Sequence, residues 1–471
     1  MEQTQTNTIA AIATPRGTGG IAVIRISGSG AFDVGEKIFR HKNKTCKNFH
    51  DIPTNTAAFG EIINGGKIID EGVAVKFNAP KSYTGEDIVE ISCHGGVYIT
   101  NAVLKCAIEA GARLANPGEF TKRAYINGKI SLTGAEAIGR LILASNETGA
   151  RVARAQSKGG LSKKIAEISE RIKRIISEVY VYIDYPGEDL TDMTSDVMLD
   201  NLTNINNDLE SLKKSYDVGK VISDGINCAI IGKPNTGKST LLNLLSQNDV
   251  AIVHDTPGTT RDIVTSRVNV GAFTLNLYDT AGIRNTSDDI ENIGIEKAKL
   301  KIDDCVLIIG VFDINDIYGE EDNKVLEILK REQNSGKKII IVLNKCDKYD
   351  MIDSIDNILD IRPLIISAKN NSTLNSVTAY DALKDCIDDI YKIEEYNLDS
   401  GEILTEDRQY FEICEACRNL NSAIDALKNG LTQDIAGLDL ELAVQNLDRC
   451  DSKSVSEDIV AMIFRNFCVG K

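Results

Sequence analysis

Long hydrophobic runs are missing from this sequence. No stretch of 18 apolar residues occurs among its 471 residues, which excludes a membrane-spanning helix. The first residues show no basic region followed by an apolar run, so we expect no secretory leader. Basic charge is also in deficit, since 53 Lys and Arg face 69 Asp and Glu, for a formal charge of −16. A general nucleic-acid coat protein, which needs a basic surface, is therefore disfavoured.

Tight cysteine frameworks, internal repeats and low-complexity tracts are absent as well. The 11 cysteines are odd in number and far apart, which favours reduced thiols in a cytoplasmic protein. Cys414 and Cys417 have no second pair, so packing explains them better than a zinc site. With 42% hydrophobic and 26% charged residues, the composition is that of a globular chain of about two to four domains.

The hydrophobic pattern changes along the chain and predicts a multidomain protein. Residues 1–120 mix strand-like runs, helix signals and Gly-rich turns, as in an α+β domain. Residues 121–220 and 391–471 have helical spacing, whereas residues 221–390 alternate strand-like and helix-like segments, as in a parallel sheet covered by helices. We infer that the α/β domain is inserted into one all-α domain built from two segments. Two separate bundles would give a similar pattern.

The clearest motif is G-x-x-x-x-G-K-[ST], which follows the strand-like run INCAII and precedes an apolar helical segment. Its glycines allow backbone N–H groups to converge on phosphates at a helix N-terminus. Lys238 is expected to reach the β- and γ-phosphates, and Ser239 to bind Mg²⁺. The residues assigned to the nucleotide here are Asn235, Thr236, Gly237, Lys238, Ser239 and Thr240.

Three further motifs follow strand-like runs in the order typical of a Ras-like P-loop GTPase: DTAG, NKCD and SAK. The Asp347 carboxylate can accept two hydrogen bonds from guanine, and adenine offers no such pair of donors. The motifs therefore predict an enzyme that hydrolyses GTP. The residues that they add to the nucleotide site are Asp279, Gly282, Asn344, Lys345, Asp347, Ser367, Ala368 and Lys369.

The segment TPGTTRD, between the first two motifs, suits a switch loop, with Thr260 as the second Mg²⁺ hydroxyl. Many small GTPases carry Gln after DTAG to orient water, but here the residue is Ile283. Glu291 is a candidate for that task, although a solvated helix residue is an equally good interpretation. Asn235 suits a monovalent cation that stabilises charge, and Arg261 or Arg284 acting as an arginine finger is the alternative.

These motifs, together with the N-terminal blocks TPRGTGGIAVIRISG, SYTGEDIVEISCHGG and NPGEFTKRAYINGK and the terminal FCVGK, resemble the MnmE (TrmE) family of tRNA-modification GTPases. The resemblance covers nearly the whole chain. It implies an N-terminal folate-binding domain that forms homodimers, a helical domain from two segments, and an inserted GTPase domain. It also implies an FAD-dependent partner, MnmG, and a K⁺-stimulated GTPase cycle. The reaction implied is the addition of aminomethyl or carboxymethylaminomethyl groups to C5 of the tRNA wobble uridine.

The resemblance also implies roles for single residues. Glu291 would orient water, Mg²⁺ would meet Ser239 and Thr260, and Cys468 would be a functional thiol. The K⁺ ligands would be Asn235, His254, Thr256 and Thr259, with His254 standing where the family pattern has Thr. The cofactor 5-formyl- or methylene-tetrahydrofolate would be bound by Arg25, Glu90, Lys129 and Lys471. A carboxylate tail suits Arg or Lys, and the donors of a pterin edge suit Glu.

Two other classes of function are open to a chain with these GTPase motifs. A ribosome-assembly or regulatory GTPase would act as a switch, but the region after Tyr391 lacks the basic G-x-x-G unit of a KH fold. A membrane-remodelling GTPase would need a basic amphipathic face, which we do not find. The Lys- and Arg-rich stretch Arg151–Arg174 is the best candidate for contact with tRNA phosphates, and a solvated helix face is its alternative.

Overall fold

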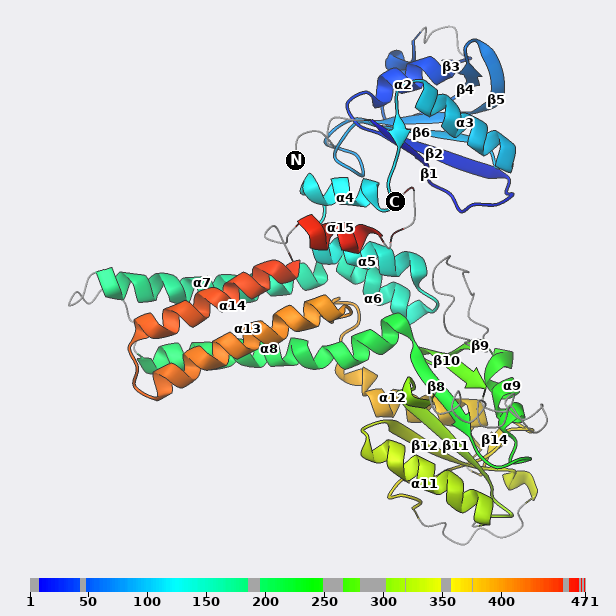
Figure 1. Cartoon of the computed structure of the whole chain (residues 1–471), viewed down its shortest axis with the longest axis vertical. Coiled ribbons are helices and arrows are strands. Elements are labelled where there is room, and N and C mark those ends of the chain that lie inside the picture. The colour runs from blue at the N-terminus through cyan, green and yellow to red at the C-terminus, as the bar shows by residue number, and fades with distance from the viewer. Residues whose placement is uncertain are drawn as a thin grey trace, which may run out of the picture. The chain divides into compact units, whose positions relative to one another are not determined.

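A computed structural model describes most of the chain (Figure 1). The described residues are 8–42, 48–184, 195–248, 266–279, 302–317, 319–348, 357–374, 376–451 and 457–465, with Phe467 and Gly470. They form two compact units, one of residues 1–139 and 448–471 and one of residues 140–447. Among the described helices, none combines the length and the apolar character needed to cross a membrane.

The first unit is built on a seven-stranded sheet whose neighbours are antiparallel, apart from the parallel pair β1 and β7. Helices α2 (Ala31–Ile38) and α3 (Val97–Glu109) pack against the sheet over an apolar core. In sheet order the strands are β3 (Phe39–His41), β4 (Ala57–Asn64), β5 (Lys67–Phe77), β6 (Ile88–His94), β2 (Ile21–Ser27), β1 (Ile9–Ile12) and β7 (Arg113–Leu114).

Side chains alternate between the two faces of this sheet, as the period of two in a strand requires. On β2, Ala22, Ile24 and Ile26 are buried in the core, while Ile21, Val23 and Arg25 point to the other face. That other face stays partly open: Ile21 is 70% exposed, and Phe59 on β4 is 50% exposed.

The C-terminal helix α15 (Glu457–Arg465) belongs to the same unit and packs against α4 (Glu119–Ile126). Phe464 is buried there with Ala135, which lies on α5 (Leu132–Leu143). Gly118, just before α4, has a φ of +66°, and a Cβ at this position would lie 2.6 Å from the Phe464 carbonyl oxygen. The start of α4 therefore requires glycine, because both the backbone angle and the close approach of α15 exclude a side chain.

A bundle of long helices forms part of the second unit. It contains α6 (Glu147–Ser157), α7 (Gly160–Asp184), α8 (Ser195–Asp224), α13 (Asp407–Lys428) and α14 (Gln433–Asp451). Helix α13 runs along α8, although a sheet separates them in the sequence (Figure 1). On α7 the buried residues follow steps of three and four, which confirms the helical spacing of this segment.

The inserted sheet of the second unit lies between α8 and α13 in the sequence. Its central strands are parallel and apolar on both faces, as expected for a sheet covered by helices α9 (Lys238–Asn248), α11 (Glu320–Asn334) and α12 (Ala379–Tyr391). In sheet order the strands are β14 (Ser372–Thr373), β13 (Leu364–Ser367), β12 (Lys338–Asn344), β11 (Leu307–Asp313), β8 (Ile226–Ile231), β10 (Phe273–Asp279) and β9 (Ser266–Val270).

Residues 397–406 return the chain from this sheet to the bundle without a helix or strand of their own. They pass very close to two helices. A Cβ on Gly160 would lie 2.0 Å from the Ser400 carbonyl oxygen, and a Cβ on Gly219 would lie 2.0 Å from the Leu404 carbonyl oxygen. The buried Gln156 side chain donates a hydrogen bond to the Ile403 carbonyl oxygen. Glycines on α7 and α8 thus make room for the returning backbone.

Candidate functional site

The phosphate loop connects the buried strand β8 to helix α9, as the motif requires. Gly232 lies so close to β11 that a Cβ would meet the Val311 carbonyl oxygen at 2.2 Å. Gly237 has a φ of +96°, and a Cβ there would lie 2.1 Å from the Asn344 amide nitrogen. Glycine is therefore required at both positions, because a side chain would clash with β11 or with Asn344.

Lys238 opens α9 and folds back over the loop. Its ammonium group donates hydrogen bonds to the carbonyl oxygens of Gly232 at 2.9 Å and Lys233 at 2.7 Å. The next residue, Ser239, is exposed in the first helical turn, and Thr236 is fully buried with its hydroxyl donating to the Lys233 carbonyl oxygen. A phosphate placed at this helix end would meet a lysine cation, an exposed serine hydroxyl and the positive end of the helix.

Asn344, the last residue of β12, joins three loops of the site. Its amide nitrogen donates to the Thr236 carbonyl oxygen at 2.8 Å, and its amide oxygen accepts from the Ala368 backbone N–H at 2.9 Å. The side chain is almost completely buried. The phosphate loop and the loop that contains Ser367, Ala368 and the exposed Lys369 are thus held together by one side chain.

One hydrogen bond and one ion pair organise the loop that follows β12. Asp347 lies in the short 3₁₀ helix Cys346–Lys348 and accepts a hydrogen bond from the Ser367 hydroxyl at 2.6 Å. Lys345 has a φ of +68° and forms an ion pair with Asp313 at 2.6 Å. Hydrogen bonds from Lys345 and from Asn315 outweigh the effect of burial and hold the pKa of Asp313 below its ordinary value. The structure therefore brings together the loops that the sequence assigned to guanine.

Several predicted site residues fall at or beyond the limits of the described chain. Asp279 ends β10 beside Ile230 of β8, so its backbone lies at the strand ends that carry the phosphate loop. Thr240 lies in the first turn of α9. Outside the described residues lie His254, Thr256, Thr259, Thr260, Arg261, Gly282, Arg284, Glu291, Cys468 and Lys471. The roles assigned to them stay predictions.

In the first unit, Arg25 and Glu90 are cross-strand partners on β2 and β6 and form an ion pair at 2.7 Å. The Arg25 guanidinium also lies over two aromatic rings, 5.3 Å from the centre of Tyr83 and 5.7 Å from that of Phe120. Cation–π contacts of this kind orient the guanidinium and shield it on its faces. The sequence had singled out Arg25 and Glu90 but not the two rings, because nothing in their spacing shows this contact.

Gly470, close to the C-terminus, lies at the same place. Arg25 donates a hydrogen bond to the Gly470 carbonyl oxygen at 3.3 Å. Gly470 has a φ of +101°, and a Cβ on it would lie 2.1 Å from the Ile12 carbonyl oxygen of β1. The penultimate residue of the chain thus lies against the sheet next to the Arg25–Glu90 pair, in a position that only glycine fits.

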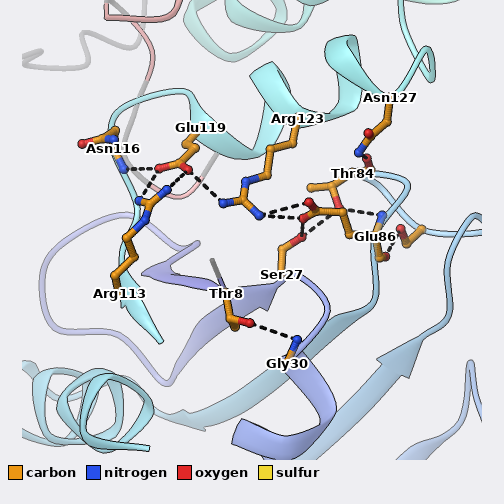
Figure 2. Close-up of polar contacts among 11 residues, drawn as sticks. Thr8, Ser27, Gly30, Thr84, Glu86, Arg113, Asn116, Glu119, Arg123 and Asn127 are labelled. Carbon is orange, nitrogen blue, oxygen red and sulfur yellow. Dashed lines mark hydrogen bonds and ion pairs between the residues drawn. The ribbon is translucent and has the colours of Figure 1, made fainter. Parts of the chain in front are cut away.

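A buried ionic network supports the loop that carries Tyr83 (Figure 2). Arg123 on α4 donates to both carboxylate oxygens of Glu86, at 3.1 and 2.9 Å, and to Glu119 at 3.0 Å. Glu119 also pairs with Arg113, and Glu86 accepts from the Ser27 hydroxyl at 2.8 Å. Burial alone would raise the pKa of Glu119. The hydrogen bonds that its carboxylate accepts outweigh this effect and hold the pKa below its ordinary value.

The same loop is fastened to α4 and to the residues that follow this helix. The Tyr83 hydroxyl is hydrogen-bonded to the Thr121 hydroxyl at 2.8 Å, and Asn127 donates to the Thr84 carbonyl oxygen at 2.7 Å. Lys129 donates to the Pro80 carbonyl oxygen at 2.8 Å. Arg25, through the Tyr83 ring, and Lys129, through the Pro80 carbonyl oxygen, therefore both contact one loop, residues 80–87.

The basic stretch Arg151–Arg174 is less available for phosphates than its composition suggests. Arg151 is paired with Asp399, and both Lys164 and Arg171 are paired with Asp208. Some of its cations thus neutralise carboxylates of the same unit. Cys417 on α13 is buried, and this burial raises the pKa of its thiol to about 12, which agrees with a packing role.

The sheet order, the phosphate loop after its first strand and the guanine-recognition loops after later strands are those of a P-loop GTPase. Here the GTPase sheet interrupts a helical bundle and is accompanied by an α+β unit. Two family models match the chain: "GTP-binding protein TrmE N-terminus" over residues 8–129 and "MnmE helical domain" over residues 132–468. The chain belongs to the tRNA modification GTPase MnmE family.

Similar proteins cover the chain from end to end. The tRNA modification GTPase MnmE of Acetivibrio thermocellus is 38% identical over 99% of this chain and 99% of its own. The protein of the same name from Lactococcus lactis is 37% identical over 99% of this chain and 98% of its own. Among solved structures, Era in complex with MgGDPNP and 16S ribosomal RNA nucleotides aligns with 41% of this chain and 66% of its own, at 24% identity and a TM-score of 0.26. A similarity that low carries no argument about this protein.

Proposed function

We propose that this protein is the GTP-hydrolysing subunit of a tRNA-modifying complex. Its product would be an aminomethyl or carboxymethylaminomethyl group on C5 of the wobble uridine, with a tetrahydrofolate one-carbon unit as the source. Membership of a family whose curated members are named tRNA modification GTPases supports this reaction. We also propose four segments. Residues 1–120 form the folate-binding and dimerisation domain, and residues 221–390 form the GTPase domain. Residues 121–220 and 391–471 are the two segments of the helical domain.

One observation carries the proposal beyond GTP hydrolysis: Arg25 donates to the Gly470 carbonyl oxygen. A GTPase that acts only as a switch has no need for its C-terminal tail to lie against an arginine–glutamate pair on a separate sheet. The pair offers a cation for a carboxylate tail and an acceptor for the donors of a pterin edge. A folate bound there would be held by Arg25 and Glu90, with Lys129 and the terminal Lys471 as further cations.

For GTP hydrolysis, each group of the phosphate loop has a distinct task. Lys238 would exchange the carbonyl oxygens that it now contacts for the β- and γ-phosphates, and the Ser239 hydroxyl would hold Mg²⁺ together with Thr260. Asn235 is exposed on the outer turn of the loop, where its amide oxygen suits K⁺. K⁺ would supply positive charge near the developing negative charge on the phosphates. Asp347, hydrogen-bonded to Ser367, would accept the two guanine donors.

The open face of the first sheet supports a homodimer. The exposed side chains Ile21 and Phe59 share this face with Arg25. A second copy that covered them would also enclose the Arg25–Glu90 pair, and burial of apolar area of this kind favours association. We further propose MnmG as the FAD-dependent partner and tRNA as the substrate of the complex.

The alternative, a ribosome-assembly or regulatory switch, is not favoured by membership of this family, and cells without this protein distinguish the two functions. Nucleosides from their bulk tRNA would be measured by mass spectrometry, with complementation by the wild-type gene and by Arg25→Ala. We expect a C5-substituted wobble uridine to disappear, to return with the wild type and to stay absent with Arg25→Ala. An unchanged nucleoside profile in cells without the protein would refute the modification function and leave the switch.

A further inference from the structure

The side chain of Lys233, the second residue of the phosphate loop, has no part in the motif, yet it is fully hydrogen-bonded. Its ammonium group donates to the Asp322 carboxylate at 2.7 Å, the Asp316 carboxylate at 2.9 Å and the Asp316 carbonyl oxygen at 2.6 Å. These three acceptors match the three donors of a lysine. The two carboxylates raise the pKa of Lys233 above its ordinary value, so it stays charged.

Asp322 lies in the first turn of α11 and is completely buried. The carboxylate oxygen that meets Lys233 also accepts from the Gly319 backbone N–H at 3.3 Å, at the start of the helix. Its other oxygen has no hydrogen-bond partner among the described residues. A buried carboxylate of this kind depends on its cation, because a charge without a counter-charge is costly inside a protein. Lys233 and Asp322 therefore form a firm link between the phosphate loop and α11.

The main chain of Lys233 supports two neighbours in the loop. Its carbonyl oxygen accepts from the Lys238 ammonium at 2.7 Å and from the Thr236 hydroxyl at 3.0 Å. Two residues later, Asn235 has a φ of +62°, the left-handed region that non-glycine residues seldom adopt. Such a conformation persists where the surrounding structure holds the chain on both sides. Asn344 holds the loop from one side, at Thr236, and the Lys233 side chain holds it from the other.

We propose that the Lys233–Asp322 pair positions Asn235 for the K⁺ that accelerates GTP hydrolysis, so that both residues are positioning residues for this reaction. The proposal rests on the proposed function, because it assumes that Asn235 binds K⁺. The outer turn of the loop, Lys233–Asn235, faces a hollow that is also lined by Asp313, Asp316, Glu320 and Lys345. The pair fixes this turn against α11 and thereby sets where the Asn235 amide points.

The test compares GTP hydrolysis by the full-length wild type and by Asp322→Asn, in KCl and in NaCl of equal ionic strength. We expect the ratio of the two rates to fall by about tenfold in the variant, the usual order for loss of a group that orients a metal ligand. Affinity for a fluorescent GDP analogue should change by less than about threefold, because the amides around Lys238 and the Asn344 bridge are kept. The melting temperature is measured alongside to show that the variant is folded.

Controls separate this role from a structural one and from failure of the proposed function. Glu327→Gln removes the same charge from an exposed position on α11 and should leave the ratio unchanged. In the double variant Lys233→Met with Asp322→Leu, the ratio of the hydrolysis rates in KCl and NaCl should fall no further than in Asp322→Asn alone. The effects of two residues that act as a pair are not additive. If the wild type hydrolysed GTP at the same rate in KCl and in NaCl, the proposed K⁺ site itself would be refuted. A K⁺ effect that survives in Asp322→Asn would refute the positioning role, and so would parallel losses of the ratio and of GDP affinity.

Discussion

Asn344 shows how one side chain decides the geometry of a whole site. It bridges the Thr236 carbonyl oxygen and the Ala368 N–H, and its amide lies where a Cβ on Gly237 would have to be. Removing it would leave a buried carbonyl oxygen and a buried N–H unpaired, each at a cost of about 1–3 kcal/mol. Two loops that are far apart in the sequence thus depend on one amide for their relative position.

The clearest prediction for a single residue concerns Asn235. Asn235→Ala should abolish the gain in GTP hydrolysis rate in K⁺ over Na⁺, because no side-chain oxygen is left for the cation. Alanine is also strained at a φ of +62°, so Asn235→Gly is the matched variant, which accepts this angle without an amide. Steady-state hydrolysis in the two salts is the measurement. If Asn235→Gly kept the full response to K⁺, the amide would have no role in the mechanism.

The residues of the nucleotide site could be predicted from sequence because each motif is local. Four short patterns, each after an apolar run, identify loops that must meet at the carboxyl ends of parallel strands. Contacts made by unremarkable residues could not be predicted in this way. Nothing in the sequence pairs Lys233 with Asp322, or places Tyr83 and Phe120 on Arg25, since these contacts join segments far apart in the chain.

At the scale of elements, the hairpin β9–β10 links the GTPase sheet to the bundle. The Thr274 hydroxyl on β10 is bonded to Ser145 at 3.0 Å and to Asn146 at 2.8 Å, in the loop between α5 and α6. It also donates to Asn269 on β9 at 2.8 Å. This hairpin follows TPGTTRD, the segment predicted to be a switch loop. Its hydrogen bonds with residues 145 and 146 join the GTPase sheet to the start of the helical bundle.

Replacing Thr274 with Val tests how much this contact contributes to stability. Valine keeps the shape and the strand preference but leaves the Asn146 and Asn269 amides without their buried partner. We expect the free energy of unfolding of this unit to fall by about 1–3 kcal/mol. Denaturant titration followed by circular dichroism measures it. Thr203→Val, at an exposed position on α8, should change it by less than about 0.5 kcal/mol.

The network around Arg123 makes the first unit sensitive to acid. Because the pKa of Glu119 is lowered in the folded state, its carboxylate stabilises the fold above the unfolded pKa of about 4.3. This contribution is lost as the pH falls below that value through the folded pKa. Amide hydrogen exchange of the α4 segment, corrected for intrinsic rates, should show protection that decreases below about pH 4.5. Glu119→Gln should weaken the protection of α4 at pH 7 and reduce its dependence on pH. If the protection in this variant fell with pH as it does in the wild type, Glu119 would not be the source of the acid sensitivity.

The elements themselves followed from the sequence where their pattern is regular. The strand-like run INCAII is β8, and the helical spacing before residue 185 is α7. The return segment 397–406 could not be predicted, because its course depends on Gly160 and Gly219, which are far away in the sequence. A glycine in a helical pattern signals only a weakened helix, and the backbone that fills its empty space is visible only in the fold.

At the scale of the whole molecule, residues near the two ends of the chain build one unit. Helix α15 packs on α4, and Gly470 contacts β1 and Arg25. The sequence alone could mark the terminal FCVGK as distinctive through its resemblance to a family, but it could not show that Gly470 lies against the first sheet. Gly470 therefore lies beside Ile12 and Arg25, more than 400 residues away in the sequence.

Gly470→Ala tests this return of the tail. A Cβ would clash with the Ile12 carbonyl oxygen and is strained at this φ, so the tail should move away from Arg25. We expect the dissociation constant for 5-formyltetrahydrofolate to rise by about tenfold, or about 1.4 kcal/mol, with GTP hydrolysis unchanged. Gly430→Ala is the control, because it has a φ of +74° but open space around it. If the wild type and Gly470→Ala bound folate with equal affinity, the C-terminal tail would have no role in folate binding.

The pairing of α8 with α13 has a consequence for synthesis on the ribosome. When α8 has emerged, its partner is still untranslated, since the entire GTPase sheet comes between them. At about 5–20 residues per second, roughly ten seconds or more pass before α13 appears. The GTPase sheet can fold in this interval, while the face of α8 that contacts α13 in the folded protein still lacks that partner. The two-segment helical bundle therefore cannot be completed until translation of the chain is nearly finished.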